Sequence, residues 1–216
     1  MGGIGPTFLR RLLESIRSQS FTNYEIIVSD HCSGNEIKSI CSIFHKVRRV
    51  VFTEKKGNSS ANLNNALKYA EGKFIKIILQ DDFLSANDSL ERMIGKVGDK
   101  KWLAHSYWHT DYDAISRFRP TKPFIPEDHK QLLRKNTIGA PTAIMFQNCE
   151  LRFDENLLWS MDLEFYYRLL CRLGMPTIIK YPLAVQTLWH GQLTNKLSNE
   201  IRNWEHGYIK AKYKLD

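Results

Sequence analysis

The alternation of helix-like and strand-like segments in the first part of this sequence constrains its fold more than any other feature. Apolar residues from Leu9 to Ile16 recur at the spacing of one helix face. Three later runs rich in Ile, Val and Phe have the length and composition of buried strands, and helical patterns separate them. Such alternation predicts an α/β fold with a mainly parallel sheet flanked by helices. The predicted strands are residues 24–29, 47–52 and 74–79.

Two local patterns predict where the intervening helices begin and end. Ser33 and Glu36 have the spacing of a capping box, in which each side chain bonds a backbone N–H of the other's turn. Gly72 follows the helical pattern of residues 63–70 and is predicted to end that helix in a left-handed conformation.

Acidic residues directly follow two of the predicted strands. Asp30 ends the first, and Asp81 and Asp82 come just after the third. Because ligands of parallel sheets bind beyond the carboxyl ends of the strands, these acids are predicted to share one rim. Of two adjacent carboxylates, one can accept hydrogen bonds from a ribose, while the other offers oxygen to Mg²⁺ or Mn²⁺ bridging a diphosphate. A solvated Asp-Asp turn is the alternative, but the position after a buried strand favours a functional pair.

Composition limits the compartments and partners that fit. A chain of 216 residues suits one well-buried domain, and no apolar run approaches the roughly 20 residues of a membrane helix. Four scattered cysteines without a C-x-x-C pair, and an N-terminus without the apolar core of a secretory signal, indicate a cytosolic protein. The net charge of +8 suits nucleotide diphosphates or anionic lipid surfaces. No zinc-finger or RNA-binding signature is present, so nucleic acid is not an expected partner.

The alternation stops after residue 97. Residues 110–136 are irregular and basic, and residues 199–216 form a tail of aromatics and lysines at loosely helical spacing. Without repeats, low-complexity tracts or a linker, residues 1–216 are predicted to form one domain. The strands expected in this half are residues 102–107, 143–147 and 177–180, and the helix is residues 160–173.

Further candidates for chemistry lie in this second half. Asp162 is in the first turn of the predicted helix SMDLEFYYRLL, where the helix dipole alone favours an acid and a general base is the alternative. His190 is a surface residue unless the fold brings it to an acidic metal site. His105 and His109 are not a predicted metal pair, because four strand residues separate them by about 13 Å.

Three stretches together resemble family 2 glycosyltransferases of the GT-A fold, a large family of inverting nucleotide-sugar enzymes. They are LRRLLESIRSQSFTNYEIIVSD, SSANLNNALKYAEGKFIKIILQDDFL and IGAPTAIMFQNCELRFDENLLWSMDLEFYYRLLCRLG, in the order usual for the family. The resemblance implies that Asp30 contacts the donor base and that Asp81 and Asp82 form the DXD-type metal and ribose motif, with Asp82 as the metal ligand. It also implies that Asp162 is the catalytic base.

The same resemblance places Gly139, in TIGAPT, in a loop beside the acceptor pocket. It places His190 at the histidine that completes the metal or diphosphate site. Residues 1–100 are then the nucleotide-sugar half and residues 101–198 the acceptor half.

The sequence departs from the family pattern in three places. Family members usually begin with an apolar strand of the kind V-S-I-I-I-P-T-Y-N that helps to wall the nucleotide pocket, and this chain opens with MGGIGPTF instead. The acid expected soon after Asp30 is absent, and Asn35 stands near its place. Leu79 stands where many members carry a further aspartate. The first departure bears most on donor affinity and stability, since it removes a strand.

The implied function is inverting, metal-assisted transfer of a sugar from a nucleotide-diphosphate donor to an acceptor hydroxyl, in glycan or polysaccharide synthesis. The implied cofactor is Mn²⁺ or Mg²⁺, the acceptor a glycan or a lipid-linked sugar, and the location the cytoplasm or its membrane surface. Two alternatives stay open. One is a catalytically silent relative that binds nucleotide or a partner, for which the missing strand is the motive, and the other is a basic membrane-surface protein without sugar chemistry.

Overall fold

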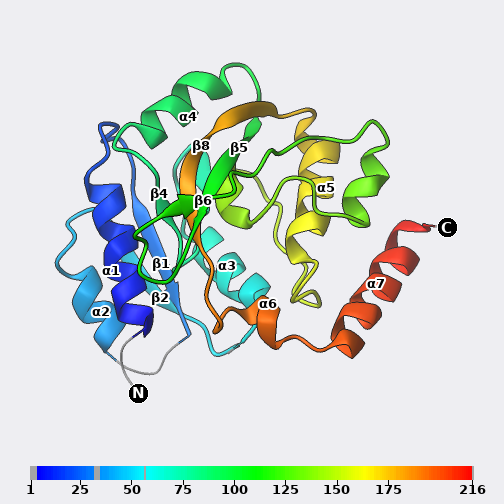
Figure 1. The fold of residues 1–216 in the computed structure, drawn as a ribbon, viewed down its shortest axis with the longest axis horizontal. Helices are drawn as coiled ribbons and strands as arrows, with labels where there is room; N and C mark the ends of the chain where they lie inside the picture. The colour runs from blue at the N-terminus through cyan, green and yellow to red at the C-terminus, as the bar shows by residue number, and fades with distance from the viewer. Residues whose placement is uncertain (1–3, 32–34, 56, 216) are drawn as a thin grey trace.

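Two β-sheets with flanking helices make up the structure, a computed structural model that describes residues 4–31, 35–55 and 57–215 (Figure 1). β1 (Ile26–Asp30) and β2 (Val47–Phe52) pair in parallel as a small sheet. The other sheet has six strands in the order β3-β7-β5-β8-β4, with β6 paired to β5. Its strands are β3 (Phe74–Lys76), β4 (Phe83–Leu84), β5 (Trp102–Thr110), β6 (Arg117–Phe118), β7 (Ile144–Gln147) and β8 (Thr177–Thr187).

The helices cover the sheets on opposite sides. In Figure 1, α1 and α2 lie beside the small sheet, whereas α5 and α7 lie at the other side of the molecule. No helix of the described chain is long and apolar enough to cross a membrane. The α-helices are α1 (Ile4–Arg17), α2 (Glu36–Cys41), α3 (Ser59–Leu67), α4 (Ser89–Val97), α5 (Met161–Leu173), α6 (Leu193–Lys196) and α7 (Asn199–Tyr213), and the 3-10 helices are η1 (His129–Leu133) and η2 (Pro141–Ala143).

The α/β class is confirmed, and parallel and antiparallel pairings are mixed in it. Among the described pairings only β1–β2 and β5–β8 are parallel, while β3–β7, β5–β7, β4–β8 and β5–β6 are antiparallel. The cause is that β3 does not lie beside β1. It pairs instead with β7, a strand from the second half of the chain that runs the opposite way. Among the described residues, α1 is the first element of the chain.

Several predicted boundaries shift. The third predicted strand keeps regular pairing only to Lys76, and α3 ends at Leu67, so Gly72 does not cap it. Asn58 caps the start of α3 instead, since its side chain accepts a hydrogen bond from Ala61 N at 2.8 Å. Ser33 of the predicted capping box lies outside the described residues, and the N-cap of α2, Asn35, makes no side-chain capping bond.

The six-stranded sheet separates two hydrophobic cores because successive strand residues point to opposite faces. On β5, Trp102 belongs to the core beneath α5, and its neighbour Leu103 belongs to the core beneath α1 and α4. On β7, Phe146 and Met145 divide in the same way. The six-stranded sheet is therefore packed on both faces. This packing fixes the points at which the chain leaves β3, β5 and β8.

Candidate functional site

Asp82 is an enclosed acid at the turn after β3. Only 1% of its surface is exposed, and its carboxylate accepts hydrogen bonds from the Thr142 hydroxyl and, at 3.3 Å, from the N–H of Thr187. Burial, and then the charge of neighbouring Asp81, raise the pKa of Asp82 well above its usual range. A group in this state gains strongly from a nearby positive charge.

Asp81 turns toward the segment that follows β8. Its carboxylate accepts hydrogen bonds from the Trp189 indole N–H at 2.9 Å and from the Gln192 amide at 3.3 Å. Its backbone carbonyl accepts from Arg11 on α1 at 3.2 Å and from the Thr187 hydroxyl. Asp81 is partly buried, so of the two acids it is the one with access to solvent.

The acid pair fits a hard divalent cation in one specific way. Among the described residues no three His, Cys, Asp or Glu side chains are grouped closely enough to hold an ion by themselves. Magnesium sites of nucleotide enzymes commonly use only one or two carboxylates, because substrate phosphates complete the coordination. Asp81 and Asp82 match that donor set, since they supply two carboxylates at one turn.

Among the described residues, His190 reaches this acid pair only through its sequence neighbour Trp189. Its side chain is exposed, and its ring packs edge-on against that of Trp189, with 5.7 Å between the centroids. The Trp189 indole binds Asp81, and His190 is the next residue along the chain after Trp189.

Asp162 lies in the first turn of α5, as predicted, and is held there by two hydrogen bonds. The Asn136 amide donates to one carboxylate oxygen at 2.6 Å, and the N–H of Leu163 donates to the other at 2.7 Å. Burial raises the pKa of Asp162 to about 7, and the hydrogen bonds oppose this only in part. A base works best when its pKa is near the operating pH, so this carboxylate is suited to take a proton from a hydroxyl at neutral pH.

Gly139 is required where it stands by its conformation and by a close contact. Its φ is +112°, and a Cβ there would lie 2.6 Å from the Tyr107 ring. Its carbonyl accepts hydrogen bonds from Asn136 at 3.0 Å and from the Tyr166 hydroxyl at 2.9 Å. Gly139 therefore belongs to the same hydrogen-bonded unit as the base.

The segment 136–142 connects the two acidic ends of the candidate site. Asn136 at its start binds Asp162, and Thr142 at its end binds Asp82. Tyr107 on β5 lies between them: burial raises its pKa to about 12, with smaller contributions from the charges of Asp82 and Asp162. Both acids are thus within electrostatic reach of one phenol.

Asp30 occupies a different part of the molecule. It ends β1 and, with Gln80, lines a large cavity between the two sheets. Asp81, Asp82 and Asp162 are not part of the described lining of that cavity. The structure therefore brings Asp81, Asp82, Gly139 and Asp162 into one connected region and places Asp30 in the lining of the cavity.

The start of α5 is anchored by α7, the segment predicted only as a tail. Glu205 on α7 is fully buried and accepts hydrogen bonds from three successive backbone N–H groups at 2.6–3.2 Å. These belong to Leu158, Trp159 and Ser160, directly before α5. A buried carboxylate with several N–H donors is strongly held, so α7 fixes the segment that presents Asp162.

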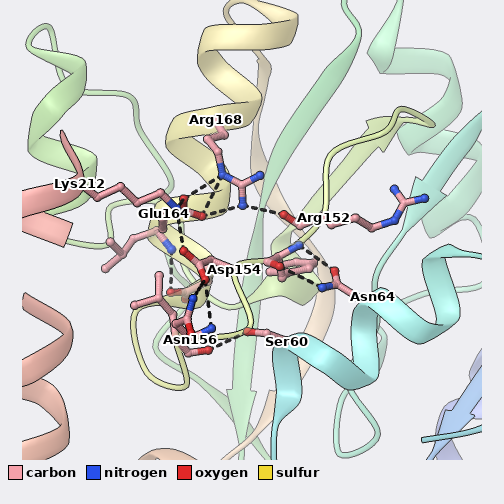
Figure 2. A network of polar contacts seen from close by, with 12 residues as sticks. Ser60, Asn64, Arg152, Asp154, Asn156, Glu164, Arg168 and Lys212 are labelled. Atoms are coloured by element: carbon pink, nitrogen blue, oxygen red, sulfur yellow. Dashed lines mark hydrogen bonds and ion pairs between the residues drawn. The ribbon is translucent and has the colours of Figure 1, made fainter. Parts of the chain in front are cut away.

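A second network holds the N-terminal part of α5 to α7 (Figure 2). Glu164 is buried and binds Arg168 at 2.7 Å and Lys212 at 2.8 Å, and Lys212 also binds Asp154 at 2.6 Å. In Figure 2, Asn64 reaches from α3 to the chain before Asp154, and its amide donates to the Phe153 carbonyl at 2.9 Å. The loop before α5 is therefore fixed from both sides.

Sequence reasoning missed most of the residues that support these acids. Nothing in the sequence marked them, although Asn136 and Thr142 flank the glycine that the family resemblance had selected. They are Arg11, Tyr107, Asn136, Thr142, Thr187, Trp189 and Glu205.

Solved glycosyltransferases share this architecture. Staphylococcus aureus TarS in complex with UDP-GlcNAc superposes with a TM-score of 0.66 at 15% identity, over 93% of this chain and 62% of that one. The mannosyltransferase PcManGT of Pyrobaculum calidifontis, in complex with GDP-Man and Mn²⁺, gives 0.63 at 16% identity, over 98% of this chain and 61% of that one. The fold is that of GT-A glycosyltransferases.

Sequence comparison defines the family. Residues 5–156 match glycosyl transferase family 2, so the chain belongs to that family. Among its relatives is WcaA of Escherichia coli, a putative colanic acid biosynthesis glycosyl transferase, 23% identical over 95% of this chain and 77% of its own length. The chain spans 9% of another relative and about three fifths of the solved chains named above.

Proposed function

We propose that this chain transfers a sugar from a nucleotide-diphosphate donor to an acceptor hydroxyl with inversion at the anomeric carbon. The observation that carries this proposal is the arrangement around Asp162. A carboxylate with a pKa of about 7 is tied through Asn136 and the segment 136–142 to a second acidic centre at Asp82. Inverting transfer needs both ends, since one must take a proton while the other assists a departing diphosphate.

At the acceptor end, Asp162 removes the proton from the acceptor hydroxyl as its oxygen attacks the anomeric carbon. The bond from that carbon to the diphosphate oxygen breaks on the opposite face, and the electron pair leaves with the nucleotide diphosphate. Asn136 holds one oxygen of Asp162 and the N–H of Leu163 holds the other, so the carboxylate is kept in one orientation while it takes the proton.

At the donor end, Asp81 and Asp82 would hold Mn²⁺ or Mg²⁺ together with the diphosphate. The cation would supply positive charge to the leaving group. Asp81, the more accessible acid, is the better placed to meet the cation or the ribose, and Asp82 adds a second negative charge behind it. This differs from the sequence-based choice of Asp82 as the direct ligand. His190 is proposed as a further contact to the cation or diphosphate, and Asp30 as the contact to the base.

The relatives support this class of substrate. TarS was solved with UDP-GlcNAc and PcManGT with GDP-Man and Mn²⁺, so both bind nucleotide sugars, and WcaA is named for colanic acid biosynthesis. By similarity we propose a glycan or lipid-linked sugar as the acceptor, in polysaccharide or glycan synthesis. The net charge of +8 is compatible with peripheral contact to an anionic membrane surface.

The proposal is tested by incubating the folded protein with a panel of UDP-, GDP- and dTDP-sugars and Mn²⁺ and measuring the released nucleotide. Release from one donor is expected, with EDTA abolishing it, and NMR of the transferred sugar is expected to show inversion. If a folded protein releases nucleotide from no donor, the silent alternative replaces this one. Binding to anionic vesicles that ignores nucleotide sugars and metal would support the third alternative, a membrane-surface protein.

A further inference from the structure

Arg11 on α1 is a partly buried cation that lies against the turn of the acid pair. One terminal nitrogen of its guanidinium donates a hydrogen bond to the Tyr112 carbonyl at 3.2 Å. The other donates to the Asp81 carbonyl at 3.2 Å and to the Thr187 hydroxyl at 2.7 Å. These three acceptors are far apart in the sequence. Arg11 therefore joins the turn after β3, the end of β8 and the loop between β5 and β6.

Two aromatic rings hold the guanidinium of Arg11 in place. Its central carbon lies 5.0 Å from the centre of the Phe8 ring and 4.7 Å from that of Phe83, the residue directly after Asp82. Cations are attracted to the faces of such rings. The Nε–H group of Arg11 is buried and has no hydrogen-bond partner among the described residues. Because a buried donor without a partner lowers stability, stability alone does not account for a guanidinium at this position.

The contacts of Arg11 are part of a closed circuit around Asp81. Arg11 binds the backbone carbonyl of Asp81, and the Trp189 indole binds its carboxylate at 2.9 Å. The Phe8 ring packs edge-on against both the Tyr112 ring and the Trp189 ring, with 5.3 Å between the centroids in each case. Since Arg11 also binds the Tyr112 carbonyl, the backbone and the side chain of Asp81 are held by one connected group of residues.

Arg11 also places a fixed positive charge near both acids. Burial lowers the pKa of Arg11, and the charges of Asp81 and then Asp82 raise it. An arginine keeps its proton in proteins, so this charge is permanent. It offsets part of the repulsion between the two adjacent carboxylates. Arg11 can therefore act on the acid pair in two ways, through its charge and through the geometry of its hydrogen bonds.

We propose that Arg11 is a positioning residue of the donor end, which holds the Asp81 carboxylate where it meets the cation and the diphosphate. The inference rests on the proposed function, in which Asp81 and Asp82 hold the cation. Divalent cations need ligand oxygens at defined positions, Mg²⁺ most strictly. The planar fork of an arginine reaches several acceptors in fixed directions, and the compact ammonium of a lysine does not. The fork of Arg11, more than its charge, thus sets the affinity for the diphosphate.

The first experiment measures binding of UDP, GDP and dTDP with Mn²⁺ to the full chain by isothermal titration calorimetry. Arg11→Lys keeps the charge and removes the fork, and Arg11→Met removes both. Both variants are expected to raise the Kd of the nucleoside diphosphate that binds by roughly 10–100-fold, the usual cost of losing a partner behind a metal ligand. Arg10→Lys and Arg10→Met, at the exposed neighbour on the same helix, should leave the Kd unchanged. If Arg11→Met fails to fold, Arg11→Lys decides.

Steady-state kinetics separate positioning at the donor end from a general loss of structure. With the donor found in the panel, Arg11→Lys should raise the KM for donor. The midpoint near pH 7 in the plot of kcat against pH should stay where it is, because it belongs to Asp162 at the other end of the site. A residue that only supports folding would lower the stability without this difference between the two ends.

Amide hydrogen exchange tests the role of Arg11 without any nucleotide. The N–H of Thr187 donates to Asp82 at 3.3 Å, and the N–H of Leu188 donates to the Thr110 carbonyl at 2.8 Å. Both amides should exchange faster in Arg11→Lys than in the unmodified chain, because the end of β8 loses its link to the turn. If the unmodified chain binds no nucleoside diphosphate, the proposed function fails, and faster exchange would still show that Arg11 positions the turn.

Two results would overturn the proposal. Normal affinity and normal exchange in Arg11→Lys, with weaker binding only in Arg11→Met, would mean that the charge of Arg11 acts and its fork does not. Lower stability of both variants in thermal unfolding, with an unchanged Kd for every nucleoside diphosphate that the unmodified chain binds, would restrict Arg11 to folding.

Discussion

A hydrogen bond of 2.6 Å joins the Asn136 side-chain amide to the carboxylate of Asp162. The same amide group also donates to the Gly139 carbonyl, and its oxygen accepts from the Gly139 N–H at 2.7 Å. The base and the glycine loop are thereby held as one unit, and Thr142 at the far end of the segment extends the connection to Asp82. The proposed transfer reaction depends on this unit, because it holds the base Asp162 in place.

The Asn136 hydrogen bond stabilises the ionised form of Asp162, while burial raises its pKa to about 7. Asn136→Ala removes the opposing contribution, so the pKa of Asp162 should rise further and the base should be protonated over a wider range. The midpoint of the rising limb in a plot of kcat against pH should move from near 7 to a higher pH. Asn87→Ala, at an exposed asparagine, is the control and should leave the midpoint unchanged. An unmoved midpoint in Asn136→Ala would mean that the limb reports another group.

Gly139→Ala should destabilise the protein through two separate costs. The positive φ disfavours any side chain, and the new methyl group would meet the Tyr107 ring at 2.6 Å. Gly174→Ala is the matched control, because Gly174 also has a positive φ, of +79°, but has open space around it. Thermal or urea unfolding should place the free energy of unfolding of Gly139→Ala about 1–3 kcal/mol below that of Gly174→Ala, the typical cost of overpacking. Equal losses would show that the Tyr107 contact relaxes freely.

Glu205→Gln tests the anchoring of α5 by α7. The buried carboxylate of Glu205 serves three backbone N–H groups, and a neutral amide with one oxygen cannot satisfy them all. Urea unfolding should show a loss of about 2 kcal/mol in the free energy of unfolding. Steady-state kinetics should show a lower kcat with little change in the KM for donor, since the change displaces the segment before Asp162. Glu200→Gln, on the exposed first turn of α7, should change neither by a measurable amount. A fall in stability with an unchanged kcat would restrict Glu205 to a structural role.

The parts of this fold that the sequence predicted are those governed by local pattern. The helix face from Leu9 to Ile16 and the strand at residues 47–52 form as predicted, because periodicity and composition determine them within one element. Parallel pairing of β3 was predicted from alternation alone. It failed because β3 found an antiparallel partner in β7, which lies some seventy residues further along the chain. Pairing between distant strands is not encoded in either strand's own pattern.

The site divides in the same way. Asp81, Asp82, Gly139 and Asp162 were selected by motif and prove to be connected, whereas Asn136 carries no pattern that distinguishes it from a surface asparagine. The sequence also did not predict that Asp82 is buried while the adjacent Asp81 is partly exposed. Burial of Asp82 results from contacts with Thr142 and Thr187, whose approach depends on the whole sheet.

Those environments predict different consequences for the two acids. Asp81→Asn should abolish the Mn²⁺-dependent part of nucleotide-diphosphate binding in isothermal titration calorimetry, because Asp81 is the more accessible donor. Asp82→Asn should weaken that binding less and should affect stability more. The pKa of Asp82 is raised in the folded state, so its ionisation destabilises the fold as the pH rises above the usual carboxyl range. Without metal, the free energy of unfolding of the unmodified protein should therefore fall relative to that of Asp82→Asn as the pH rises above the usual carboxyl range. The reverse pattern, with metal-dependent binding lost only in Asp82→Asn, would restore Asp82 as the direct ligand.

The most direct test of the account is to measure donor binding and sugar transfer in Asp162→Asn with the donor found in the panel. Asparagine preserves the shape of the side chain and cannot accept a proton, so donor affinity should stay within about twofold while kcat falls by roughly 10²–10⁴. The pH dependence near 7 should disappear at the same time. Transfer at a near-normal rate by a folded Asp162→Asn protein would contradict the central claim that this carboxylate is the base.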